Sequence, residues 1–238
     1  MNTFWKYTTL GMIISATVSG CGSGPTDGDE AVEATTGALS NDPSLIRTGS
    51  DCGTQTIPGA EQVLIYSGFN FSGTCKVLLP GFYPLPANMN IPNDSLRSLK
   101  LGSAVRVRAF DDQIYGGASS TVAVTTASFF AFGASSMRVE DASRSSTCND
   151  TRRNEVTFKD GPAGGDCVSV PAGGFYPDPQ HMGIRNDSVS TIVYFGSSLN
   201  YSAYVDANFQ RKCFGSDAAI TFLVGTACDN TISSWRME

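Results

Sequence analysis

Two short stretches of this chain place oxygen-bearing side chains at matching positions. Residues 93–98 read NDSLRS, and residues 186–191 read NDSVST. Carboxylate, amide and hydroxyl oxygens are hard ligands of the kind that calcium binds. At the fifth position the second stretch has the hydroxyl of Ser190, whereas the first has the guanidinium of Arg97. Unit charges about 4 Å apart repel by several kcal/mol even at an effective dielectric near 20. We therefore expect a cation site at the second stretch and none at the first.

Two further stretches complete a set of four. Residues 131–136 read AFGASS, and residues 229–234 read DNTISS. Upstream of each stretch lies an aromatic-x4-aromatic-x-Gly pattern or a degraded copy of it. The four copies are Tyr66-x4-Phe71-x-Gly73, Phe110-x4-Tyr115-x-Gly117, Phe158-x4-Ala163-x-Gly165 and Tyr204-x4-Phe209-x-Arg211. The third copy has lost its second aromatic residue, the fourth has lost its glycine, and Thr191 replaces the last serine of NDSVST. A period of this kind indicates an internally repeated fold.

The repeats are organised in two halves. Residues 73–102 align with residues 165–196, so the chain divides into residues 51–142 and 146–238. In both halves short alternating apolar runs are separated by Gly, Pro, Asn, Asp and Ser, and no window has a sustained helical period. This pattern predicts an all-β fold.

At this point the repeat resembles the Greek-key motif of the βγ-crystallins. In that family an aromatic corner precedes an [ND][ND]xx[ST]S element, and two motifs form one domain of two packed four-stranded sheets. The four motifs cover nearly all of residues 60–238. The resemblance therefore implies two Greek-key β-sandwich domains.

The resemblance also implies how the [ND][ND]xx[ST]S elements bind calcium. An early Asn or Asp side chain, the next carbonyl and the fifth-position hydroxyl act as ligands, and a hairpin carbonyl from a motif of the same domain completes each cage. The ligands are shared crosswise between the two motifs of a domain. We expect two Ca²⁺ ions in residues 146–238, bound in the micromolar to millimolar range. The candidate residues are Asp160, Asn186, Asp187, Ser188, Ser190, Asp206, Asp229, Asn230, Thr231 and Ser233.

The first half carries degraded versions of these elements. AFGASS keeps Ser135 and Ser136 but has no acidic residue, and Arg97 can bridge Asp94 as an internal cation. We expect residues 51–142 to fold without metal. The structural alternative for all four stretches is that Asn, Asp and Ser make good turns by bonding their own backbone.

Seven cysteines give an odd count, so one is used differently from the rest. The repeat suggests the pairs Cys52–Cys75 and Cys148–Cys167, which leaves Cys213–Cys228. Six cysteines allow about 15 connectivities, and a zinc site is the rival interpretation. The chain contains no CxxC pair, so we favour disulfides, which form outside the cytoplasm.

The seventh cysteine follows an export signal. Residues 1–20 contain Lys6 and a short apolar run from Leu10 to Val18, and Val18-Ser19-Gly20-Cys21 resembles a bacterial lipobox. The resemblance implies cleavage before Cys21 and its acylation, with the outer membrane favoured; the alternative is an ordinary secretory signal. Residues 21–50 are acidic and lack aromatic residues, which predicts a flexible tether.

The remaining features argue against other functions. A net charge of −6 does not suit a nucleic-acid partner. The single histidine, His181, has no partner in the sequence pattern, while Phe82, Phe175 and Trp235 are predicted core residues, so we do not expect an enzyme. The expected protein is an exported, lipid-anchored, calcium-binding protein of the cell envelope. The alternatives are a metalloproteinase inhibitor with this fold and an adhesin or glycan-binding module.

Overall fold

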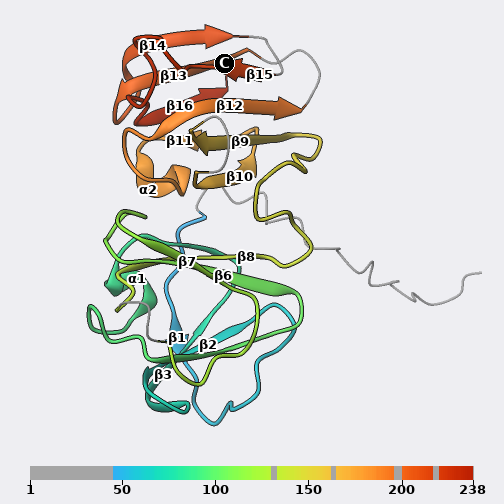
Figure 1. The fold of residues 1–238 in the computed structure, drawn as a ribbon, viewed down its shortest axis with the longest axis vertical. Coiled ribbons are helices and arrows are strands. Elements are labelled where there is room, and N and C mark those ends of the chain that lie inside the picture. The colour runs from blue at the N-terminus through green and yellow to red at the C-terminus, as the bar shows by residue number, and fades with distance from the viewer. Residues whose placement is uncertain (1–44, 130–132, 162–164, 196–199, 217–219, 238) are drawn as a thin grey trace, which may run out of the picture. The chain divides into compact units, whose positions relative to one another are not determined.

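The computed structural model describes residues 45–129, 133–161, 165–195, 200–216 and 220–237 (Figure 1). The predicted signal peptide, Cys21 and most of the tether lie outside the described residues, as do Ala131, Phe132 and Ala163. Residues 45–50, which we predicted to belong to the tether, are part of the fold. Leu45 is buried, Ile46 bridges to Phe82, and Gly49 donates a backbone hydrogen bond to Asn88.

The first half consists of strands and one short helix. Their bounds are β1 Ser50–Asp51, β2 Val63–Gly68, β3 Ser72–Leu78, β4 Gly81–Tyr83, α1 Pro86–Met89, β5 Ser98–Leu101, β6 Val105–Phe110, β7 Ser119–Val122 and β8 Ser136–Asp141. They form two four-stranded antiparallel sheets with the orders β1-β3-β2-β5 and β4-β8-β6-β7.

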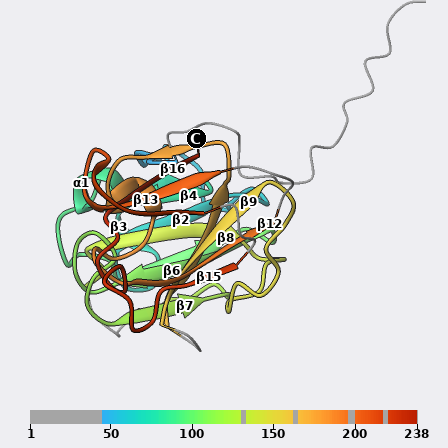
Figure 2. The ribbon, with the colours of Figure 1, turned by 90° about the horizontal axis from the view of Figure 1, so that it is seen from above.

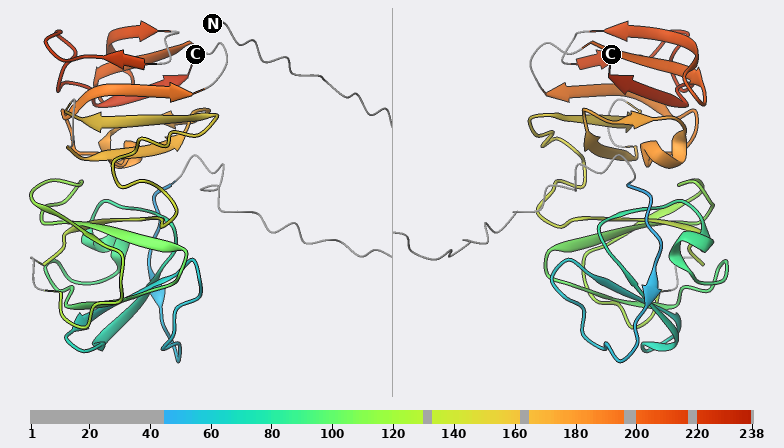
Figure 3. Two further views of the ribbon diagram at one scale, coloured as in Figure 1. Left: turned by 45° about the vertical axis from the view of Figure 1, so that its right-hand side comes forward. Right: turned by 180° about the vertical axis from the view of Figure 1, so that it is seen from behind.

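The second half repeats this arrangement. Its elements are β9 Glu155–Asp160, β10 Cys167–Pro171, β11 Phe175–Tyr176, α2 Pro179–Met182, β12 Val189–Phe195, β13 Tyr201–Asp206, β14 Gln210–Ser216, β15 Ile220–Phe222 and β16 Ser234–Met237. The sheet orders are β10-β9-β12-β15 and β11-β16-β13-β14. Figure 2 shows β13 beside β16, and Figure 3 shows the orange and red strands from two sides.

Each motif exchanges its third strand with its neighbour. In the second half β11 joins β16 and β15 joins β12, so neither sheet is built from one motif alone. In the first half β4 joins β8, but the reciprocal contact is reduced to one bridge between Leu99 and Thr126. The added strand β1 pairs with β3 at the opposite edge. The predicted all-β Greek-key fold is confirmed.

All three predicted disulfides form: Cys52–Cys75, Cys148–Cys167 and Cys213–Cys228. The first ties the residue that follows β1 to β3. The third ties the edge strand β14 to the residue that directly precedes DNTISS. The repeat was therefore sufficient to choose one connectivity.

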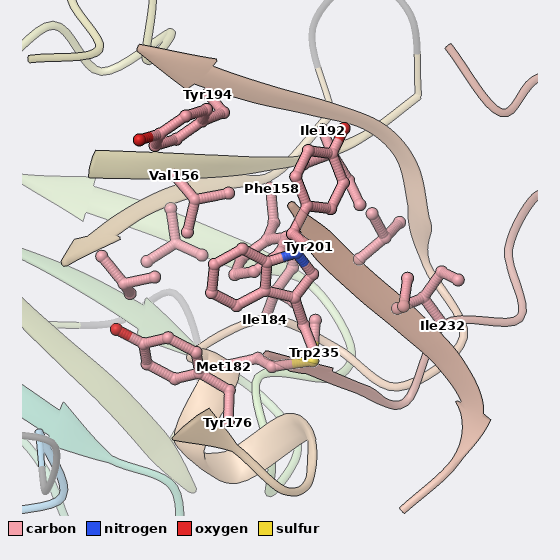
Figure 4. Packing of buried hydrophobic residues seen from close by; sticks show 14 of the residues in the cluster. Val156, Phe158, Tyr176, Met182, Ile184, Ile192, Tyr194, Tyr201, Ile232 and Trp235 are labelled. Carbon is pink, nitrogen blue, oxygen red and sulfur yellow. The ribbon is translucent and has the colours of Figure 1, made fainter. Parts of the chain in front are cut away.

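The core of the second half is centred on Trp235, which is fully buried (Figure 4). Its indole lies near the rings of Phe158, Tyr176 and Tyr201, with centroids 5.7–6.0 Å apart. Aromatic side chains bury large apolar areas, so this cluster contributes much of the stabilisation of the half. A second cluster, which includes Leu78, Leu99 and Met137, fills the first half.

The two halves are joined by a buried ion pair. Arg138 of β8 is fully buried, and its guanidinium donates to the Gly183 carbonyl at 2.6 Å and to the carboxylate of Asp166. Phe82 packs against Gly183 and is only 3% exposed. The matching residue of the second half, Phe175, is 58% exposed, so its prediction as a core residue was wrong. Its ring contacts only the edge of Phe209 among the described rings.

Candidate metal centre

The last serine of three motifs holds the aromatic corner in place. Its hydroxyl donates to a hairpin carbonyl at 2.6–2.7 Å and accepts from the backbone N–H of the second corner aromatic at 3.0–3.1 Å. The three sets are Ser98 with Gly68 and Phe71, Ser136 with Asp112 and Tyr115, and Ser234 with Asp206 and Phe209. The hydroxyl of this last serine is therefore used to hold the hairpin. The hydroxyl at the fifth position is not used in this way, so it is the one that could bind a cation.

The third motif departs from this rule. Thr191 replaces the serine, and its buried Oγ1 has no hydrogen-bond partner among the described residues. In the other three motifs the donor to this hydroxyl is the backbone N–H of the second corner residue. The matching residue of the third motif, Ala163, lies outside the described residues.

We call the four stretches 93–98, 131–136, 186–191 and 229–234 arches. The residue type at the second position of three of them has a structural explanation. Asp94, Asp187 and Asn230 have φ angles of 55°, 51° and 54°, which is the left-handed region. Asp and Asn tolerate this region better than most other side-chain-bearing residues. The backbone alone therefore favours these residue types, as the structural alternative proposed, and only the contacts between arches can argue for a ligand site.

Those contacts run crosswise in the second half. Ser190 of the third motif donates to Asn230 Oδ1 of the fourth at 3.0 Å. In turn, Ser233 of the fourth motif lies 2.9 Å from Asn186 Oδ1 and 3.0 Å from Asp187 Oδ1 of the third. Sequence could not settle which motif completes which site. The structure pairs the fifth-position hydroxyl of each arch with the early side chain of the other.

The hairpins extend each crosswise pair to three residues. Asp160 lies opposite Val189 in the β9–β12 register and so is adjacent to Ser190. The carbonyl of Asp206 accepts from Ser234, the neighbour of Ser233. We call Asp160, Ser190 and Asn230 cage A, and Asp206, Ser233 and Asp187 cage B.

Cage B opens onto a groove of about 400 Å³. Six of the ten predicted ligand residues line it, and they are Asn186, Asp187, Asp206, Asn230, Thr231 and Ser233. These residues offer carboxylate, amide and hydroxyl oxygens, the donor set that calcium prefers and zinc does not. The donor chemistry of the groove therefore fits a hard divalent cation.

The remaining predicted residues lie differently. Ser188 is buried, and its hydroxyl donates to the Arg185 carbonyl at 2.8 Å, so only its carbonyl could serve as a ligand. Asp229 accepts from Gly225 N through one oxygen, while the other oxygen is buried and has no hydrogen-bond partner in the described part of the chain. Asp160 belongs to cage A but not to the groove.

Both hairpin carboxylates already have an arginine partner, which the sequence analysis missed. Arg185 Nη2 lies 2.9 Å from Asp160 Oδ2, and Arg211 contacts both carboxylate oxygens of Asp206. Burial raises the pKa of Asp160, whereas the hydrogen bond from Arg211 lowers the pKa of Asp206. In the sequence, Arg211 stands where the motif has glycine, and this departure could have indicated the ion pair between Arg211 and Asp206.

The first half retains one complete cage. Its cage B counterpart consists of Asp112, Ser135 and Asp94, and Ser135 donates to Asp94 Oδ1 at 3.1 Å. The contact matches the one between Ser233 and Asp187 in the second half. Gly133 allows it, because a Cβ at this position would lie 2.3 Å from the Asp94 Cα.

The cage A counterpart of the first half lacks the oxygen-bearing side chains of cage A. Arg97 occupies the hydroxyl position, and its guanidinium donates to the carbonyls of Asp94 and Leu96 at 2.8 and 2.9 Å. The contact to Asp94 is thus to its carbonyl rather than to its carboxylate. The other change, the missing acid of AFGASS, belongs to the same cage. With crosswise pairing, the replacement by Arg97 and the missing acid of AFGASS both fall on the cage A counterpart. The cage B counterpart keeps its oxygen-bearing side chains.

His181 is not isolated, in contrast to its sequence-based interpretation. Its Nδ1 lies 2.7 Å from Asp178 Oδ1, which also accepts from the His181 backbone N–H. Asp178 is the N-cap of α2, so the pair has the geometry of a helix cap. No group of three or more His, Cys, Asp or Glu side chains converges anywhere in the described residues. Any metal site in this region therefore depends on amide, hydroxyl and carbonyl oxygens.

No protein-family model and no curated protein sequence matches this chain. Solved βγ-crystallin domains are similar to parts of it. The domain from Flavobacterium johnsoniae is 23% identical and covers 35% of this chain and 98% of its own length, with a TM-score of 0.33. The domain from Clostridium beijerinckii is 28% identical and covers 33% and 95%, with a TM-score of 0.31.

The N-terminal domain of Protein S is 21% identical and covers 34% of this chain and 97% of its own, with a TM-score of 0.33. Each of these solved domains corresponds to about a third of this chain. The exchanged third strands and the repeated arches make the fold βγ-crystallin-like.

Proposed function

We propose that the chain is a non-enzymatic calcium-binding protein whose second half holds two Ca²⁺ ions, one in cage A and one in cage B. The observation that supports this proposal is the crosswise contact of Ser190 with Asn230 and of Ser233 with Asp187. These contacts bring hard oxygens from distant parts of the chain within 3.0 Å of each other. A serine that donates to a carboxylate in the absence of metal can turn its oxygen toward a cation.

The same geometry extends the proposal to one site in the first half. Asp94, Ser135 and Asp112 form the counterpart of cage B, and no ion-pair partner of Asp94 or Asp112 is found among the described residues. Arg97 keeps the cage A counterpart empty of metal by supplying its own charge. We therefore expect three Ca²⁺ ions per chain. The sequence analysis, which considered each arch separately, predicted two.

Isothermal titration of the full chain with calcium tests this proposal. We expect about three ions, a loss of one with Asp94→Ala and of another with Asp187→Ala. Ser188→Ala is the matched control, because its hydroxyl lies outside all cages. A stoichiometry that does not change with Asp187→Ala would contradict cage B, and no calcium heat at all would contradict the proposal as a whole.

Bound calcium would act by stabilising the folded state. A ligand present at a hundred times its Kd adds about 2.7 kcal/mol to the free energy of unfolding. Such a gain suits a structural protein of the cell envelope, where the medium varies. Thermal melting with calcium and with a chelator measures the gain directly.

The same proposal places the protein outside the cytoplasm, anchored through an acylated Cys21. Three disulfides support export, because disulfides persist in oxidising compartments. Among the described residues, no helix has the length and apolar character that a membrane crossing needs. Cell fractionation with Cys21→Ala tests the anchor, and we expect the variant to leave the outer-membrane fraction.

One observation favours a second candidate, the metalloproteinase inhibitor. Ile57 is 78% exposed at the tip of the loop that follows the Cys52–Cys75 disulfide. The loop is braced, because Gln55 donates to the Ile57 carbonyl at 3.0 Å and Lys100 donates to the Thr56 carbonyl at 2.7 Å. A rigid loop loses little entropy when it enters a cleft.

Inhibition assays against a metalloproteinase with an apolar specificity pocket test the second candidate. We expect inhibition by the full chain and its loss with Ile57→Asp, which leaves the braces in place. Equal inhibition by both chains, or none by either, would exclude the loop.

A further inference from the structure

The hairpin of the fourth motif contains an arginine where its counterpart in the second motif contains glycine. Arg211 corresponds to Gly117, and both have left-handed φ angles, 49° and 70° respectively. This region disfavours a residue with a Cβ. The side chain at Arg211 must therefore provide something that offsets the strained backbone.

The side chain of Arg211 engages both oxygens of the Asp206 carboxylate. Nη2 donates to Oδ1 at 2.7 Å, and Nε donates to Oδ2. Arg211 and Asp206 line the same groove as Asp187 and Ser233. A bidentate guanidinium–carboxylate pair is geometrically specific, so a positive charge occupies the mouth of cage B before any metal arrives.

The other two cages do not have this arrangement. In cage A the Arg185 contact reaches only one oxygen of Asp160, and Oδ1 has no partner in the described chain. In the first-half cage the position of Arg211 is taken by Gly117, and no arginine among the described residues forms an ion pair with Asp112. The three cages thus form a series with two, one and no carboxylate oxygens bound to arginine.

We propose that Arg211 is a tethered counter-ion that competes with calcium for cage B and sets its affinity below that of the other cages. This inference rests on the proposed calcium function. A cation entering cage B has to displace the guanidinium or tolerate its repulsion. Cage B then fills only at higher calcium concentration, while Arg211 balances Asp206 when calcium is scarce.

Three variants of Arg211 in the full chain test this role. Arg211→Gly removes both the charge and the strain, Arg211→Gln removes the charge alone, and Arg211→Lys keeps the charge without the bidentate geometry. We expect about tenfold tighter binding at the weakest site for the glycine and glutamine variants, a change of about 1.4 kcal/mol. The lysine variant should gain less. Arg153→Gln, a remote exposed arginine, is the control for net charge.

The assignment to cage B comes from a second substitution. When Asp187→Ala is added to Arg211→Gln, the tightened site should disappear from the calcium titration. If Arg211→Gln binds as the parent does while the parent shows three sites, the counter-ion role is wrong but the calcium function stands. If Arg211→Gly alone tightens binding, backbone strain rather than charge sets the affinity, which also overturns the inference. If neither parent nor variants bind calcium, the proposed function itself fails.

Discussion

Arg138 and Arg236 occupy matching positions in the last strand of the two halves, yet their surroundings differ. Arg138 is fully buried and paired with Asp166 of the other half, whereas Arg236 is half-buried and lies over the rings of Tyr204 and Phe209. Phe82 and Phe175 show the same contrast between buried and exposed. Duplication therefore preserved the strands, while the contact between the halves gave matching residues different roles.

The arches show a second difference between the halves. Each half has two crosswise cages, but the first half has replaced the hydroxyl of one with Arg97, and the second half has placed arginines beside the hairpins of both. An arginine in a ligand position supplies charge permanently, whereas one beside a hairpin can yield to a metal ion. Three sets of substitutions and one pH titration test this comparison.

The largest effect is expected for the buried arginine. Arg138→Met removes a fully buried guanidinium from both Asp166 and Glu140, while Arg108 still pairs with Asp166, so we expect the free energy of unfolding to fall by about 3 kcal/mol or more. Arg236→Met, the matched variant, changes a half-buried residue rather than a fully buried one and should cost less than Arg138→Met. Chemical denaturation of both variants measures the difference. If both variants lost the same free energy of unfolding, the contact of Arg138 with the second half would add no stability beyond that of Arg236.

The disulfides come next. Removing either Cys52–Cys75 or Cys213–Cys228 by paired serine substitutions should cost about 3 kcal/mol in the loop-entropy model. Only the second pair contains a residue next to the cage, Cys228, which lies two residues before Asn230, so only its loss should weaken calcium binding at cage A. Calorimetric titration of both variants separates the two effects. A calcium affinity that falls equally in both would mean that global stability, not the arch, is responsible.

The hairpin serines follow. Ser136→Ala removes a hydroxyl that serves two backbone groups, so we expect a loss of about 1–3 kcal/mol. The Thr191 hydroxyl has no hydrogen-bond partner among the described residues, so Thr191→Ala should cost less than Ser136→Ala. Thermal melting compares the two. A larger loss for Thr191→Ala would show that its hydroxyl does bind a group in the hairpin.

The smallest effect concerns pH. The pKa of Asp160 is raised by burial, so the folded state holds this proton more tightly and loses that stability as pH rises through the folded pKa. The pKa of Asp206 is lowered by Arg211, so its contribution is present above the unfolded pKa and disappears as pH falls through the folded pKa.

A charged carboxylate beside each cage favours calcium. As pH falls toward the ordinary carboxylate range near about 4, cage A should weaken before cage B, because the pKa of Asp160 is raised and that of Asp206 is lowered. Calcium titrations at several pH values, with Asp160→Asn as the control, measure this order. Loss of both cages at one pH would contradict it.

Much of this protein followed from local residue patterns. The four repeats, the all-β fold, the disulfide pairs and the oxygen donors of NDSVST and DNTISS were predicted from spacing and residue type, because turns, strands and side-chain chemistry are local properties. Phe175, which was predicted to be a core residue, is exposed, and His181, which has no partner in the sequence pattern, contacts Asp178 in the structure.

The pairing of arches required three dimensions. Ser190 meets Asn230 across 40 residues, and Ser135 meets Asp94 across 41, because the exchanged third strands bring the two motifs of each half together. When each arch was considered separately, Arg97 and the missing acid of AFGASS affected two different sites. In the fold, both changes belong to one site. Long-range strand pairing, rather than any local signal, therefore sets how many complete cages the chain contains and which arginine faces each of them.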